Sequence, residues 1–210
     1  MDNNSAIQDK FDIIIPLGES CTITWLLNSS HFKKETTLFE WFITNSLLDI
    51  VNVMNNIINE VDTPILKIDT GINIFMNNTN IRSTHYTVEE YLPIFKRRAK
   101  RLYDAIKNNK RILFVRFVRG IPPDIHEVPH TYEDISKFVS TIEKINPDTS
   151  QMKLLKIHQT PHKDYVEHPF IIYKYYEGLN VSDDNLQLSQ SDITNTFTKM
   201  VNDVGYLSGK

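Results

Sequence analysis

One cysteine stands at a position where the protein backbone could activate it as a nucleophile. Cys21 follows a turn at 17–20, which closes an apolar run at 11–15. A short apolar run bounded by turn residues is typical of a buried strand, and Ser20 would cap a following helix. The thiol would then lie in the first helical turn, where the helix dipole favours a thiolate. We expect either this reactive thiol or a buried cysteine that packs as a small hydrophobe.

Several residues elsewhere in the chain could assist such a nucleophile. Glu40 lies among aromatic residues, and it could belong to a site or face water from a short strand at 38–43. His85 precedes a basic helix and His158 ends an apolar run, so either imidazole could serve as a base. Arg116 lies within an apolar segment, where its guanidinium could bind an anionic substrate or form a buried ion pair with Glu40.

Metal and disulfide chemistry are not expected. A single cysteine excludes an internal disulfide and a zinc site built on cysteines. No two of the remaining loop histidines have the spacing of helical metal ligands, and no acid cluster accompanies them; they are His126, His130, His162 and His168. We therefore expect neither a metal nor another cofactor.

Composition and charge place the chain among ordinary globular proteins. Of its 210 residues, 40% are hydrophobic and 23% are charged, and the net charge is -3. This charge argues against a general nucleic-acid binder. No stretch has a signal-peptide pattern or ~20 consecutive apolar residues, so we expect no membrane segment and a cytoplasmic location, the host cytoplasm if the protein is viral. Residues 1–9 should form a flexible N-terminus and residues 10–210 a single α/β domain.

Strand and helix patterns alternate along the chain. The predicted strands are 11–15, 65–68, 72–76, 111–118, 152–157 and 169–173. The predicted helices begin near 21, 46, 87, 131 and 190, and a capping-box pattern at 131–134 opens the fourth of them. This alternation predicts an α/β fold of three layers, with a mostly parallel sheet and helices on both faces. Ligands bind beyond the carboxyl ends of such strands, where Cys21, Arg116 and His158 would converge.

The helix that follows Thr87 has two unusual features. Thr87 and Glu90 form a capping-box pattern at its start, whereas Pro93 should kink the first turns or delay the helix until after it. Five basic residues, at 96–98, 100 and 101, lie opposite its apolar face. We interpret them as a solvated face rather than as a nucleic-acid or phosphate site.

Five motifs, in order along residues 11–158, resemble those of an uncharacterised family described as papain-like cysteine peptidases, which occurs in bacteria and large DNA viruses. The matching positions are Leu17, Gly18 and Cys21 of an L-G-x-x-C motif, Phe39 and Trp41 of a P-F-D-W motif, His85, the helix arginines Arg97, Arg98 and Arg101, and the strand Phe114–Arg116. Glu40 stands where the family has aspartate, and Leu38 where it has proline. The segment beyond His158 shows no such likeness.

The resemblance implies a cysteine-dependent hydrolase or acyl transferase. Cys21 would be the nucleophile, His85 its base, and Glu40 the acid that orients the imidazole. The substrate would be a small molecule or a peptide, and it would contact the residues around this constellation, namely Gly18, Ser20, Trp41, Arg116 and His158.

Two other functions fit some of the same residues. The Gly18–Ser20 turn after a strand is similar to the Gly-Asp-Ser opening of SGNH-type esterases, which would make Ser20 the nucleophile. No Asp-x-x-His sequence near the C-terminus completes that triad, however. Alternatively the domain is not an enzyme, and the turn at 18–21 binds an anionic ligand such as a phosphate or a nucleotide-sugar together with Arg116.

Overall fold

The structure is a computed structural model, and it describes residues 11–18, 21–44, 46–59, 66–68, 74–76, 79–83, 85–118, 130–158, 166–175 and 190–207. The strands are β1 Ile13–Pro16, β2 Leu66–Ile68, β3 Ile74–Met76, β4 Arg82–Ser83, β5 Ile112–Val118, β6 Met152–His158 and β7 Ile171–Tyr175. The helices are α2 Cys21–Ser29, α3 Leu47–Ile58, α4 Val88–Lys107, α5 Tyr132–Glu143 and α6 Gln190–Leu207. None of these described helices is long and apolar enough to cross a membrane.

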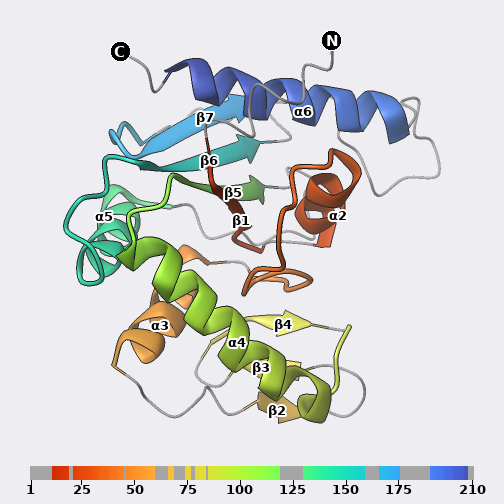
Figure 1. The fold of residues 1–210 in the computed structure, drawn as a ribbon, viewed down its shortest axis with the longest axis vertical. Helices are drawn as coiled ribbons and strands as arrows, with labels where there is room; N and C mark the ends of the chain where they lie inside the picture. The colour runs from red at the N-terminus through yellow and green to blue at the C-terminus, as the bar shows by residue number, and fades with distance from the viewer. Residues whose placement is uncertain are drawn as a thin grey trace.

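Four parallel strands form the main sheet, in the order β1-β5-β6-β7. β5 lies between β1 and β6, and all seven of its residues are buried, as its sequence predicts, which is apolar except at Arg116. Figure 1 shows the arrows of β5, β6 and β7 pointing the same way, with helices around the sheet. The predicted α/β fold with three layers is therefore confirmed.

Alternate side chains of the main sheet supply two separate cores, one on each face. Ile112 and Phe114 of β5 pack into the core that α3, α4 and α5 cover. Leu113 and Val115 point the other way, into the core that α2 and α6 cover. Because successive residues of a strand face opposite sides, the apolar residues of β5 can contribute to the cores under both layers of helices.

A smaller antiparallel sheet, in the order β2-β3-β4, lies at the end of the molecule opposite α6 (Figure 1). β2 and β3 pair as the predicted hairpin. β4 has only two residues, which is too short for a pattern of alternating side chains to predict. Ile43 and Arg82 exchange backbone hydrogen bonds of 2.8 and 3.0 Å, so the chain just after residue 40 runs alongside β4.

Capping boxes begin two of the helices, as the sequence predicts. At the start of α4, the Thr87 hydroxyl accepts a hydrogen bond from the Glu90 N–H, and the Glu90 carboxylate accepts one from the Thr87 N–H. Thr131 and Asp134 make the same reciprocal pair at the start of α5. Each box satisfies backbone donors that the first turn of a helix leaves without a helical partner.

The prediction that Pro93 delays its helix is wrong. α4 begins at Val88, and Pro93 lies inside it on an exposed face. A proline lacks the N–H that would bond to the carbonyl four residues earlier, and its ring crowds that carbonyl. That carbonyl belongs to Glu89, which is exposed, so water can replace the lost donor.

Gly18 sits at a close approach between two segments of the chain. Its φ of +72° lies in the left-handed region, which favours glycine. A Cβ atom at this position would lie 2.6 Å from Cγ2 of Thr44, well inside van der Waals contact. The turn after β1 and the segment that ends at Thr44 can therefore touch only because residue 18 has no side chain.

Gly18→Ala should destabilise the fold for two separable reasons. The left-handed backbone costs about 1–2 kcal/mol for a residue with a Cβ. Overlap with the Thr44 methyl group adds about 1–3 kcal/mol. The double variant Gly18→Ala/Thr44→Ser should recover the second part, because serine lacks the methyl group and keeps the hydroxyl. Urea unfolding of both variants, with Thr44→Ser as the control, measures the difference. A double variant no more stable than Gly18→Ala would contradict the expectation.

Candidate active site

The structure brings Cys21 and His85 together from positions 64 residues apart. Cys21 Sγ lies 3.2 Å from His85 Nε2, a hydrogen-bonding distance for sulfur and nitrogen. The cysteine forms no disulfide and is half-buried, and the histidine side chain is exposed. A thiol at this distance from an imidazole can pass its proton to the ring and become the nucleophilic thiolate.

Cys21 is positioned by the helix that it begins. α2 buries Ile23, Leu26 and Leu27 in the core on its side of the main sheet. Thr24, three residues after the cysteine, is buried. This packing fixes the direction in which the first turn of α2 presents the thiol, and the positive end of the helix dipole stabilises a thiolate there.

His85 is held from the segment between β4 and α4. The backbone N–H of His85 donates a hydrogen bond of 3.2 Å to Ser83 Oγ. The next residue, Tyr86, inserts its ring beside those of Phe42 and Tyr91, with centroid distances of 6.4 and 5.0 Å. The backbone N–H of His85 and the residue that follows it are thus held in place, although the imidazole itself is exposed.

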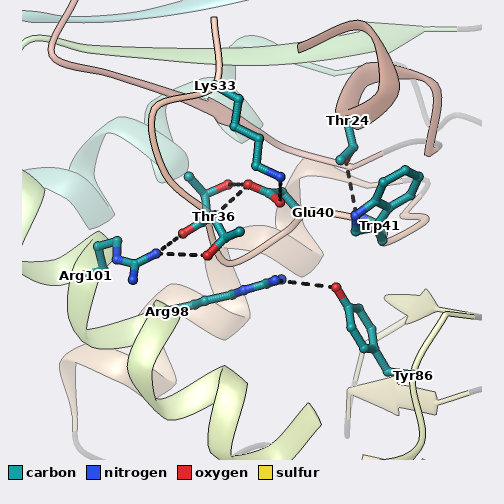
Figure 2. Close-up of polar contacts among 9 residues, drawn as sticks. Thr24, Lys33, Thr36, Glu40, Trp41, Tyr86, Arg98 and Arg101 are labelled. Atoms are coloured by element: carbon teal, nitrogen blue, oxygen red, sulfur yellow. Dashed lines mark hydrogen bonds and ion pairs between the residues drawn. The ribbon is translucent and has the colours of Figure 1, made fainter. Parts of the chain in front are cut away.

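Trp41 connects the two halves of this site. Its ring lies against that of His85, with the centroids 4.9 Å apart. The backbone N–H of Trp41 donates a hydrogen bond of 3.2 Å to Thr24 Oγ1, as Figure 2 shows, and the backbone carbonyl of Trp41 accepts one of 2.7 Å from Ser83 Oγ. The backbone of Trp41 has a φ of +64°, which is rare for a bulky residue. This tryptophan therefore bonds both to the helix of Cys21 and to the strand that leads to His85.

The structure places Glu40 away from the role of orienting acid. Its side chain is 2% exposed and accepts hydrogen bonds from the N–H and the hydroxyl of Thr37. Lys33 Nζ lies 2.8 Å from Oε2, completing the ion pair in Figure 2. In the described part of the chain, the carboxylate thus bonds within its own loop and not to His85. The alternative of a strand at 38–43 with Glu40 facing water is also wrong, since residues 38–41 form turns and the acid is buried.

Arg116 makes contacts other than either of the two expected. It is fully buried, and it donates to the carbonyl of Leu17 at 2.7 Å and to that of Thr44 at 2.8 Å. These bonds join the turn before Cys21 to the segment after Trp41. The guanidinium thus links the two loops of the site through hydrogen bonds in the interior. It neither contacts a substrate at the surface nor pairs with Glu40.

The other predicted site residues lie at different depths. Gly18 forms the close contact with Thr44, and Ser20 lies outside the described residues. His158 ends β6, is buried, and has its ring 5.8 Å from that of Tyr173. Because β5 lies between β6 and β1, the backbone of His158 is roughly 10 Å across the sheet from the strand that leads to Cys21.

The loop histidines do not gather around a metal site where the structure describes them. His130 is buried, and His168 accepts a hydrogen bond from the Phe170 N–H. His126 and His162 lie outside the described residues. Among the described residues, no group of three or more His, Cys, Asp or Glu side chains could hold a metal ion.

Two arginines of α4 support the site, although the sequence analysis assigned them to a solvated face. Arg101 donates to the carbonyl and hydroxyl of Thr36, and buried Arg98 reaches the hydroxyl of Tyr86 at 3.4 Å (Figure 2). Arg98 is three residues after buried Phe95, so helical periodicity places it at the edge of the apolar face. That spacing was the signal for a structural role.

Comparisons of the chain with protein-family models, with curated proteins and with solved structures find no match. The geometry of the site therefore carries the functional argument.

The ionisation of Asp49 should make stability depend on pH. Asp49 is buried in α3, and burial raises the pKa of its carboxyl even though Thr44 and Asn80 donate to it and Arg116 lies near. Between the unfolded pKa of about 3.9 and the higher folded pKa, the folded chain binds more protons. The free energy of unfolding therefore falls as pH rises through that window. Asp49→Asn should lose this fall, which urea unfolding from acid to neutral pH measures; a constant difference from wild type would contradict it.

Glu40→Gln separates a structural role from a catalytic one. The substitution removes the ion pair with Lys33 while keeping an acceptor for Thr37, so the free energy of unfolding should fall by about 1–3 kcal/mol. The rate at which iodoacetamide alkylates Cys21 should stay at the wild-type value, because Glu40 does not contact His85. Slower alkylation in a folded Glu40→Gln protein would contradict this expectation and would indicate that the Glu40 carboxylate assists the Cys21–His85 pair.

Proposed function

We propose that this protein is a cysteine-dependent hydrolase or acyl transferase, with Cys21 as its nucleophile and His85 as its general base. The observation that carries the proposal is the 3.2 Å contact between Cys21 Sγ and His85 Nε2 at the first turn of α2. The sequence resemblance to papain-like cysteine peptidases supports the same two residues. It adds no substrate, so the proposal covers amides, esters and thioesters alike.

The chemistry follows from the order in which the thiol proton moves. His85 accepts the proton of Cys21, and the thiolate attacks the substrate carbonyl to give a tetrahedral oxyanion. When the intermediate collapses, the imidazolium returns the proton to the leaving nitrogen, oxygen or sulfur, and an acyl-thioester remains on Cys21. His85 then deprotonates the second nucleophile. Water in that role gives hydrolysis, whereas an amine, alcohol or thiol gives acyl transfer.

The contacts of the site favour cysteine over the two alternative readings. An imidazole lies within hydrogen-bonding distance of the Cys21 thiol, and a thiol needs less help to ionise than a hydroxyl does. Arg116, which an anion site would use, is fully buried and donates to two backbone carbonyls. Both observations support a nucleophilic role for the turn at the start of α2.

Alkylation by iodoacetamide tests the proposal cleanly, because the chain has one cysteine and every labelled thiol reports on Cys21. The pH profile of the wild-type rate should show a thiol pKa below the ordinary value of about 8.5. His85→Ala should shift the profile toward that value and slow alkylation about tenfold or more near pH 6.5, since each unit of pKa changes the thiolate fraction about tenfold. A wild-type pKa near 8.5 would contradict the proposal.

Turnover provides the second measurement. Wild-type protein should release p-nitrophenol from p-nitrophenyl acetate in a burst as the acyl-thioester forms, and Cys21→Ser and His85→Ala should abolish the burst. Exposed His31, whose imidazole lies outside the pair, provides the matched control His31→Ala, which should keep it. Labelling of Ser20 by a fluorophosphonate would instead support the esterase reading. Thermal stabilisation by phosphate, with no thiol reactivity, would support the anion-binding reading.

A further inference from the structure

Among the described residues, the contacts that orient His85 come from a thiol, an aromatic ring and a hydroxyl rather than from a carboxylate. Within the described residues, the imidazole contacts Cys21 and the ring of Trp41, and its backbone N–H bonds to Ser83. Resting on the proposed function, we propose that Ser83 and Trp41 are positioning residues that hold His85 over Cys21 in place of an orienting acid.

Ser83 bridges two backbone groups with one hydroxyl. Its Oγ donates to the carbonyl of Trp41 at 2.7 Å and accepts from the N–H of His85 at 3.2 Å. The residue is fully buried, so water cannot take over either bond. Both bonds fix backbone positions, and together they set the separation between the tryptophan ring and the imidazole.

Trp41 transmits that constraint to the ring and to the nucleophile. Its backbone is in the left-handed region, with a φ of +64°, and it persists there because Thr24 holds its N–H and Ser83 holds its carbonyl. Backbone strain in a bulky residue is found where the surrounding structure over-determines it, often at functional sites. The ring that this backbone presents packs on His85 and limits the directions the imidazole can take.

The route from nucleophile to base is continuous. Cys21 and Thr24 share α2, Thr24 bonds to Trp41, Trp41 bonds to Ser83, and Ser83 bonds to His85. Each step after α2 is a hydrogen bond of 2.7–3.2 Å. Loss of any one step lets the imidazole move relative to Sγ, which weakens the hydrogen bond that favours the thiolate.

Two variants test the two contacts separately. Ser83→Ala removes both hydroxyl bonds, and Trp41→Gly removes the ring while a glycine accepts the left-handed backbone without strain. Each should raise the thiol pKa obtained from the alkylation profile, and a rise of about one unit would slow alkylation about tenfold on the acidic side of that pKa. Ser83→Thr and Trp41→Phe, which keep a hydroxyl and a ring, should restore most of the wild-type profile.

Thr79→Ala is the matched control for Ser83→Ala. Thr79 makes the same kind of bridge in the segment just before β4, since its Oγ1 donates to the Met76 carbonyl and accepts from the Ile81 N–H. It should lower the melting temperature without moving the thiol pKa. A merely structural Ser83 would behave in the same way.

The outcomes distinguish this inference from the proposed function. A lowered thiol pKa in the wild type that persists in both Ser83→Ala and Trp41→Gly overturns the positioning role and leaves the Cys21–His85 pair standing. A wild-type pKa near the ordinary thiol value overturns both. If Ser83→Ala fails to fold, Trp41→Gly, whose backbone bonds are preserved, decides the question by the same profile.

Discussion

The buried guanidinium of Arg116 joins the two loops from which the candidate active site is built. It lies on the central strand of the main sheet and donates to Leu17, just before the turn that leads to Cys21, and to Thr44, just after the segment of Trp41. Water cannot solvate a buried guanidinium, so the loss of its acceptors would lower the free energy of unfolding strongly. The carbonyls of Leu17 and Thr44 are therefore held in place. The close packing of Gly18 on Thr44 occurs at the same junction and depends on the same bonds.

Above that junction, the site is assembled from short segments that are far apart in the chain. α2 supplies the thiol, the turns before Thr44 supply Trp41, and the end of β4 supplies Ser83 and the approach to His85. None of these segments makes the site alone. Their mutual hydrogen bonds hold a strained tryptophan backbone and an exposed imidazole in one arrangement, which is the condition for a pre-organised nucleophile.

An imidazole that no carboxylate orients, as among the described residues here, is physically more suited to a cysteine nucleophile than to a serine. A thiol is already a few per cent ionised at neutral pH, and a neighbouring imidazole is enough to shift the equilibrium further. A serine hydroxyl needs a base whose charge is itself stabilised as the proton arrives. Glu40 bonds within its own loop, to Lys33 and Thr37. The described residues therefore suit a thiolate nucleophile, which needs only the imidazole.

The sequence by itself determined the strands of the main sheet and the helices around it, because the apolar run of β5, broken only by Arg116, and the boxes at Thr87 and Thr131 depend on local periodicity and local hydrogen bonds. It also selected Cys21 and His85, through residue type and motif order. Only the tertiary structure decided what surrounds them. A buried arginine bonds to the carbonyls that the fold brings near it, and spacing along the chain does not encode those partners. The partners of Glu40 lie in its own loop, but only the fold shows that the acid is buried there. For the same reason Glu40 and Arg116 became parts of the scaffold, while Ser83, an ordinary residue in a two-residue strand, came to link the backbones of His85 and Trp41.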